Sequence, residues 1–520
     1  MDTGAQERQT DGTTTPQGAS APTAPMVDAG TIPSRRHVWH DPAWLRGQLA
    51  AVGVLLLLAA CKLVLLLLDP HVRLFMGDSA TYLFAAITHA TPSDRSFTYP
   101  ILIDQTAGRS GSLISLLLLQ TCIGIAAAAT LFSILRRGCG VRGWLALLAA
   151  VLLALDPSQL FYERMIMTET VAAFCLLAGV WIVLQYLRSA RPFWLVFAAL
   201  CSTLLVSLRI GMLPLALGLA PIGPLLLAAL RGRRRVPYLE WPRFFVHLGV
   251  AVFATWFCHH QYQAWYGARA GTAPMYLRDA GIFRLGLVVP LLKPQHFEGS
   301  GVDPDILREV RLPLADPHLR EAHIWQPDGL IAALRAHAGA RADEIAERLA
   351  ERAVADDPLG LLRLGLATFA DYFDPALRTA RLRSDLGAGE LPDDHTLHLL
   401  RKRFRYQLGD LPRTPTLVSR YFEHTALWLV ICLFALPPIA LLMLWRNGRY
   451  RPAPALLIAL LACGLFVGEL LCAHIVSFRY LHPFPPLFLL CLALLMDRPR
   501  VHFRMAMPRP AVLLPQPAAT

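Results

Sequence analysis

The first long apolar run of this chain reads QLAAVGVLLLLAACKLVLLLL and covers residues 48–68. Its single charged residue is Lys62, and a helix of about 20 apolar residues is long enough to cross the hydrocarbon core of a bilayer. Similar runs recur along the 520 residues, of which 55% are hydrophobic and 17% charged, and the mean hydropathy is +0.44. The sequence therefore predicts an all-α fold, that of a polytopic membrane protein.

The apolar runs predict about ten transmembrane helices. They cover residues 48–68, 111–135, 144–155, 165–187, 193–208, 212–230, 244–265, 425–445, 453–476 and 481–497. The runs at 144–155 and 481–497 are short for a span.

The polar segments divide the chain into five parts. Residues 1–34 are rich in Thr, Ala, Pro and Gly without periodicity, which predicts a disordered cytoplasmic tail. Residues 35–266 form an N-terminal membrane domain with about seven spans, and residues 424–497 hold the last spans. Between them, residues 267–423 carry mixed charges and scattered prolines, which predicts a mainly helical extramembrane region. Residues 498–520 form a second cytoplasmic tail.

Two helices are expected inside the region 267–423. Residues 340–355 predict a solvent-facing helix with Glu344 and Arg348 at ion-pair spacing. Asp357 and Pro358 have the chemistry of an N-cap and first turn, and they start a helix too short to span. We expect this helix to lie along the outer membrane interface or to pack under the membrane domain.

The net charge of +12 is distributed as in a membrane protein, because arginines cluster in short loops between the apolar runs. Such loops stay in the cytoplasm, which predicts a multi-pass protein of the cytoplasmic membrane with both termini inside. The loops expected inside are 136–143, 188–192, 231–243 and 446–452, and those expected outside are 69–110, 156–164, 209–211, 267–423 and 477–482. This pattern argues against nucleic acid as a partner.

With this orientation, the polar residues gather at the outer ends of the spans. They are Asp78, Glu163, Arg164, Glu169, Arg209, Arg479 and Tyr480. Ionisable groups on membrane helices are costly and are candidates for function. A transporter more often places them near the bilayer midplane, whereas this depth fits an enzyme whose substrate has a lipid tail and a polar head.

Four sequence motifs resemble those of the GT-C glycosyltransferases, polytopic enzymes that use polyprenyl-phosphate sugars. The motifs are Gly77-Asp78-Ser79-x-x-Tyr82-Leu83, Pro157-x-x-Leu160 with Met167-Thr168-Glu169-Thr170, Ser207-Leu208-Arg209, and Arg479-Tyr480-Leu481-His482-Pro483. They are similar to the branch of protein O-mannosyltransferases and lipid A aminoarabinose transferases, glycosyltransferase family 39. The resemblance covers residues 45–270 and 355–497, and residues 270–355 match no motif of that family.

The resemblance implies a role for each polar residue. Asp78 would be the general base that deprotonates the acceptor hydroxyl, with Glu169 as a second catalytic carboxylate. The residues expected at the donor phosphate or its lipid are Arg209, Arg479, Tyr480 and Lys62. The residues expected to position acceptor or donor are Tyr82, Glu163 and His482. Ser79 stands where the family often has a second acidic residue, so the sequence implies no metal ligand and no certain cofactor.

Each of these residues also has a purely structural interpretation. Asp78 could be a helix N-cap, and Glu169 could favour the start of its helix through the helix dipole. Arg209 and Arg479 could extend to lipid phosphates. Tyr480 and His482 could belong to the aromatic belt of the interface. Lys62 and Glu469 lie at matching depth inside spans, which would allow them to pair.

The sequence thus predicts an integral membrane glycosyltransferase of the cell envelope. Its partners would be a polyprenyl-phosphate-linked sugar, a protein, lipid or polysaccharide acceptor, and membrane lipids. Two alternatives remain: a transporter or flippase of a lipid-linked glycan, and a glycan polymerase or ligase.

Overall fold

The computed structural model describes residues 42–75, 77–232, 239–387, 394–406 and 415–497. The tails expected at 1–34 and 498–520 lie outside these residues, as does Met76. Within the described part, the chain is 77% helical and forms no strand, although Arg73 and Met165 make one isolated parallel bridge. The expected all-α class is therefore confirmed.

Six helical segments are long and apolar enough to cross a membrane. They are α1 (Pro42–Leu68), α4 (Ile114–Ser133) continuing into η3 (Ile134–Gly138), α7 (Glu169–Ser189), α21 (Leu427–Asn447), α22 (Pro452–Cys472), and α23 (Phe478–Leu481) with α24 (Phe484–Met496). A bent pair, α9 (Leu213–Leu219) and α10 (Ile222–Ala229), makes a seventh if it is one span, with 45° between its halves. These segments indicate a multi-pass membrane protein.

The other three expected spans do not meet the same test of length and composition. The helices α5 (Gly143–Ala154) and α8 (Phe193–Leu208) are apolar but shorter. The helix α11 (Trp241–Ala270) has 30 residues but contains two histidines side by side, His259 and His260, and further polar residues. The fold therefore supports six or seven spans among the described residues and leaves the count of ten a prediction.

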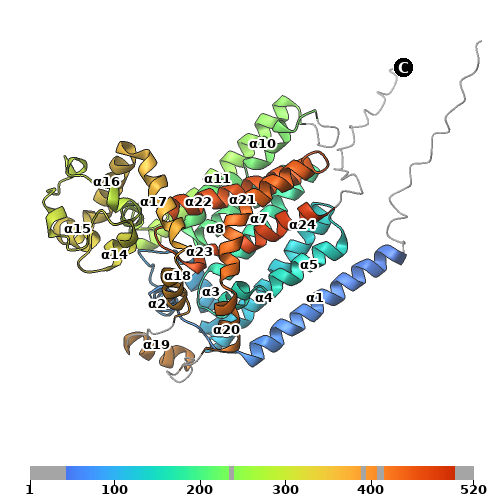
Figure 1. The fold of residues 1–520 in the computed structure, drawn as a ribbon, viewed down its shortest axis with the longest axis horizontal. Helices are drawn as coiled ribbons and strands as arrows, with labels where there is room; N and C mark the ends of the chain where they lie inside the picture. The colour runs from blue at the N-terminus through green and yellow to red at the C-terminus, as the bar shows by residue number, and fades with distance from the viewer. Residues whose placement is uncertain (1–41, 76, 233–238, 388–393, 407–414, 498–520) are drawn as a thin grey trace, which may run out of the picture. The chain divides into compact units, whose positions relative to one another are not determined.

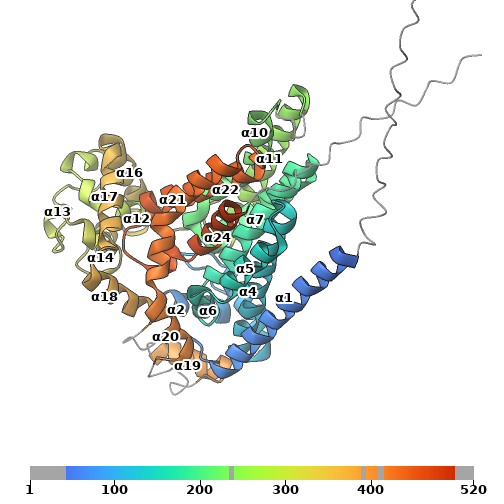
Figure 2. The same cartoon turned by 45° about the vertical axis from the view of Figure 1, so that its right-hand side comes forward.

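The spans pack into two groups that share one hydrophobic core. The first group follows the chain, with α4 beside α7, α7 beside α8 and α8 beside α11, while in the second α21 packs on both α22 and α24 (Figure 1, Figure 2). The first helix is different, because only 22% of its span Ala51–Leu68 is buried. Leu56, Leu57 and Leu67 are exposed on α1, as expected of a helix that faces lipid.

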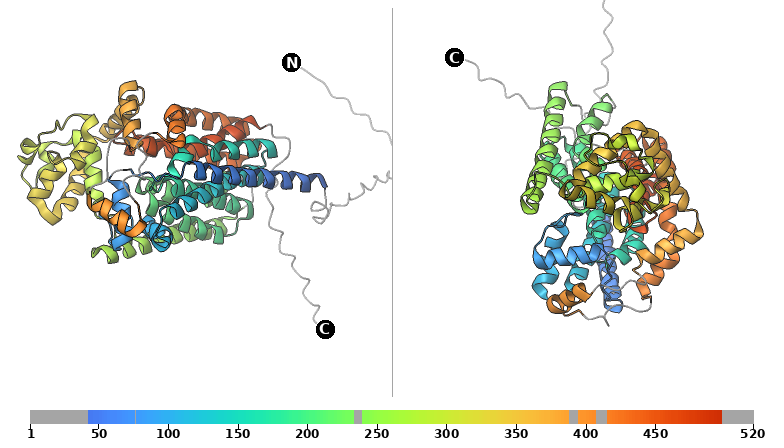
Figure 3. Two further views of the ribbon diagram at one scale, coloured as in Figure 1. Left: turned by 90° about the horizontal axis from the view of Figure 1, so that it is seen from below. Right: turned by 90° about the vertical axis from the view of Figure 1, so that its left-hand side faces the viewer.

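Residues 280–356 form a hydrophobic cluster of their own. It includes Leu285 of α12 (Ala280–Val288), Leu334 of α15 (Leu330–Ala338) and Leu349 of α16 (Ala342–Asp356), and these helices gather in one group (Figure 3, yellow). The expected ion pair Arg348–Glu344 is present at 3.5 Å. The expected solvent-facing character of α16 is only half right, because its apolar face is buried against α12.

The helix α17 (Pro358–Asp371) begins as expected, since the Asp357 carboxylate accepts from the Gly360 N–H at 2.9 Å. One face packs on the spans, where the Phe369 ring lies 5.4 Å from the ring of Phe466 in α22. On the other face Leu366 is exposed. This arrangement agrees with a helix at the membrane boundary.

Candidate functional site

Asp78 is the first residue of α2 (Asp78–Thr88), and its carboxylate lies between two guanidinium groups. One oxygen accepts a hydrogen bond from Arg479, which is 401 residues away in the sequence, and the other lies 2.9 Å from Nη1 of Arg95. The N-cap position of α2 belongs to Gly77, which has a φ of 45° and makes no capping bond with a side chain. The Asp78 carboxylate therefore acts as an ion-pair partner here and not as a helix cap.

The loops before α2 and before α7 lie side by side and bring Asp78 towards the start of α7. Arg73 N–H donates to the Arg164 carbonyl at 2.8 Å, and Ile166 N–H donates to the Arg73 carbonyl at 3.0 Å. Ser79 fastens this junction, because its buried hydroxyl accepts from Phe75 N–H at 2.8 Å and donates to the Ile166 carbonyl at 2.9 Å. Ser79, which stands where the resembling family often has an acid, thus joins the two loops.

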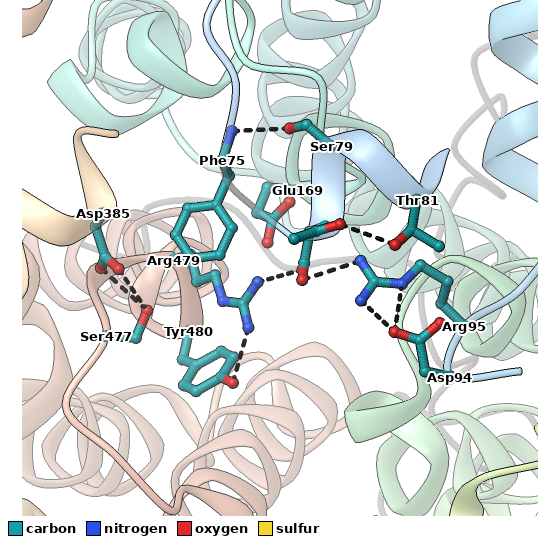
Figure 4. A network of polar contacts seen from close by, with 12 residues as sticks. Phe75, Ser79, Thr81, Asp94, Arg95, Glu169, Asp385, Ser477, Arg479 and Tyr480 are labelled. Atoms are coloured by element: carbon teal, nitrogen blue, oxygen red, sulfur yellow. Dashed lines mark hydrogen bonds and ion pairs between the residues drawn. The ribbon is translucent and has the colours of Figure 1, made fainter. Parts of the chain in front are cut away.

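Arg95, the second cation on Asp78, is held in place by the carboxylate of Asp94 (Figure 4). Its Nε and Nη2 both donate to the same oxygen of Asp94, at 3.0 and 2.5 Å. Its Cζ lies 5.1 Å from the ring centre of Tyr82, one helical turn along α2 from Asp78. Arg95 and Tyr82 therefore form one side of the site.

Arg479 belongs to α23 and enters the site from the other side. Its Nη2 donates to the Tyr480 hydroxyl at 3.0 Å, and its Cζ lies 4.5 Å from the ring centre of Phe75. The segment before it is anchored by Asp385 of α18 (Pro375–Asp385), which accepts from Phe478 N–H at 2.5 Å and from the Ser477 hydroxyl at 3.0 Å (Figure 4). Asp385 therefore fixes the position from which Arg479 reaches Asp78.

Three further charged residues lie near the ion pair of Asp78 and Arg479: Arg209, Glu169 and Glu469. Arg209 follows α8, donates from Nη1 to the Arg479 carbonyl at 3.2 Å, and lies 4.0 Å from Oε1 of Glu169 at the start of α7. Glu469, in the last turn of α22, interacts electrostatically with Arg209 and Arg479. Within the described residues, one oxygen of Glu169 and one of Glu469 are buried without a hydrogen-bond partner.

The guanidinium groups set the protonation state of Asp78. Burial alone would raise the pKa of this carboxyl, but Arg479 and Arg95 outweigh burial and hold its pKa below the ordinary value. Asp78 is therefore ionised at neutral pH. In contrast, burial raises the pKa of Asp385 to about 6, although the charge of Arg479 and the hydrogen bonds to its carboxylate oppose this rise.

Of the other residues expected at the site, Lys62 and Glu163 pair with each other, whereas His482 lies near Arg209 and the backbone of Glu169. Lys62 and Glu163 form an ion pair in which both side chains are fully buried. The expected pairing of Lys62 with Glu469 is therefore wrong, because matching depth does not decide which helices are neighbours. His482 packs its ring against Tyr162, with 5.0 Å between the ring centres.

Two residues of the site were missed in the sequence, Arg95 and Asp385. Both belong to long polar segments with many charged residues and lie outside the quoted motifs. The neighbouring pair Asp94 and Arg95, close before the aromatic residue Phe97, was the only local signal. Nothing near Asp385 marks it in the sequence.

Among the residues that the structure describes, no three His, Cys, Asp or Glu side chains come close enough together to hold a metal ion. The described chain thus defines a multi-pass helical membrane protein with a cluster of paired carboxylates and guanidiniums at one end of its spans. Comparisons with protein-family models, with curated proteins and with solved structures find no match.

Proposed function

We propose that this chain is an integral membrane glycosyltransferase that moves a sugar from a polyprenyl-phosphate carrier to a hydroxyl group of an acceptor. The observation that carries the proposal is the Asp78 carboxylate between Arg479 and Arg95 at the ends of the spans. A base for the acceptor and cations for the leaving phosphate are the two groups that this transfer needs. At this place the lipid tail of a donor stays in the bilayer while its phosphate reaches the arginines.

In the proposed reaction, the acceptor oxygen forms a bond to the anomeric carbon of the sugar while the bond from that carbon to the phosphate oxygen breaks. The acceptor proton goes to the Asp78 carboxylate, and the polyprenyl phosphate leaves with the electron pair of the broken bond. Arg479 and Arg209 offer the forked donors that suit phosphate oxygens. Glu169 lies beside Arg209, where it would position that guanidinium.

The proposal includes the side of the membrane on which transfer occurs. The arginine loops place the Asp78 end of the spans and residues 267–423 outside, with ten spans if α5, α8 and α11 also cross. Reporter fusions at Gly299 and at Gly448 should then report opposite compartments. The same compartment for both would overturn the orientation.

The decisive experiment is Asp78→Asn in a strain that lacks the chromosomal copy of this protein. Deletion should cause a polyprenyl-phosphate sugar to accumulate, and the wild-type chain should restore its consumption. Asp78→Asn should lower transfer about a hundredfold or more, the range for acid–base groups, with little change in thermal stability. The matched control is Asp356→Asn, which removes the same charge from an ion pair with Lys293 and should transfer normally.

Full transfer by Asp78→Asn would refute the role of base. A carrier that accumulates only on the cytoplasmic side of the deletion strain would instead favour a flippase. Sugar-linked carrier of abnormal chain length would favour a polymerase or ligase.

A further inference from the structure

The two guanidinium groups on Asp78 are held very differently. Arg95 is fixed by two hydrogen bonds to Asp94 and by the ring of Tyr82. Besides Asp78, Arg479 donates to the hydroxyl of Tyr480 and lies over the rings of Phe75 and Tyr480, and its Nε is buried without a hydrogen-bond partner in the described part of the chain. Nη1 of Arg95 also lacks a hydrogen-bond partner there, but Arg95 is bonded to a second carboxylate, that of Asp94. Among the described residues, Asp78 is the one carboxylate within ion-pair distance of Arg479.

An unsatisfied guanidinium donor in a buried site is costly, and a phosphate is the ligand that satisfies it best. The fork of an arginine matches two phosphate oxygens, and such charge-assisted bonds are about twice as strong as neutral ones. Arg209 donates to the backbone carbonyl of Arg479 and lies over the ring of Tyr480, 5.5 Å from its centre. A phosphate at Arg479 would therefore have a second cation close by.

The Asp78 carboxylate now occupies one end of that fork. A phosphate that approaches Arg479 brings a second anion to the same guanidinium, and two anions repel each other in a partly buried site. Arg479 can release Asp78 more easily than Arg95 can, since Asp94 and Tyr82 hold Arg95 in place.

We propose that the Asp78–Arg479 ion pair is an exchangeable contact, which the phosphate group of a lipid-phosphate ligand displaces while Arg95 keeps Asp78 in position. The inference rests on the proposed function for the role of that phosphate, which is the donor's. It adds a consequence for the order of events. Asp78 loses one of the two cations that depress its pKa only when the phosphate is bound, so that it becomes a stronger base when the donor is in place.

The test is equilibrium binding of a short-chain polyprenyl monophosphate without a sugar to the purified full chain in detergent. Asp78→Asn removes the competing anion and keeps the size of the side chain, so it should bind the probe roughly tenfold more tightly than wild type, by the strength of one charge-assisted hydrogen bond. Asp78→Ala removes the same charge without adding an amide and should change affinity in the same direction. Arg479→Lys keeps the charge but loses the fork and should bind more weakly.

Asp356→Asn is the control for net charge, because its partner Lys293 lies on the exposed surface of another part of the chain, and it should bind as wild type does. Equal or weaker binding by both Asp78 variants would overturn the inference, and so would the absence of saturable binding by any variant. If Asp78→Asn binds the probe more tightly but still transfers sugar normally in the deletion strain, the proposed function alone is refuted. Loss of transfer by Asp78→Asn with unchanged affinities would refute the exchange alone.

Discussion

Replacing Lys62 should show that α1 is held to the other helices by an ion pair. Lys62 is the charged residue of the first apolar run, and its ammonium group donates to Glu163 at the end of α6 (Pro157–Tyr162). Neither side chain is exposed to solvent. Because little else of α1 is buried, the pair should contribute a large share of its attachment.

The size of the effect follows from the surroundings of the Glu163 carboxylate. In Lys62→Met, Glu163 keeps the Gln159 amide at 2.9 Å, but its second oxygen already lacks a partner within the described residues. A buried charge that loses its partner costs about 3–5 kcal/mol. The double variant Lys62→Met/Glu163→Gln removes the stranded charge, so it should lose less than Lys62→Met alone, with a coupling of about 2 kcal/mol or more.

The assay is thermal unfolding of the four members of this cycle in detergent. The control cycle combines Lys62→Met with Glu469→Gln, which should give additive losses because these side chains do not pair. Burial raises the pKa of Glu163 despite Lys62, so the carboxyl should take up a proton in Lys62→Met, and the loss should shrink towards low pH. Additive losses for Lys62 and Glu163, or coupling between Lys62 and Glu469, would refute the reasoning.

Two further predictions concern burial. Because the pKa of Asp385 rises from 3.8 to about 6 on folding, the folded state binds its proton more tightly, and the free energy of unfolding should fall by at most about 3 kcal/mol as pH rises through this window. The melting temperature should therefore fall as the pH rises through this window, and Asp385→Asn should make that fall smaller. An unchanged dependence of the melting temperature on pH in Asp385→Asn would contradict this prediction. Gly124→Ala would place a Cβ 1.8 Å from Glu163 Oε1, so its melting temperature should drop clearly. Gly53→Ala, with nothing within 4 Å, should not lower it, and equal losses would contradict the packing argument.

The expected spans near 48–68, 165–187 and 425–445 match α1, α7 and α21 to within a few residues. Such runs are predictable because lipid requires every backbone polar group to be bonded inside the helix. Arg95 and Asp385 were not predictable in this way. Asp385 acts through Ser477 and Phe478 of a distant segment. Arg95 acts through Asp78 and Tyr82, which its loop meets by folding back. No periodicity of their own segments marks either residue.

The order of residues along the chain was enough to predict a helical membrane protein, the approximate limits of the main spans and the gathering of Asp78, Glu169, Arg209 and Arg479 at one end of them. All of this follows from hydropathy and charge along the chain, which fix the depth of a residue. The tertiary structure decided which charges meet: Asp78 with Arg479 and Arg95, and Lys62 with Glu163 in place of Glu469. Partners at equal depth are chosen by how helices pack sideways, and that packing brings together side chains that are far apart in the sequence, 101 residues for Lys62 and Glu163 and 401 for Asp78 and Arg479.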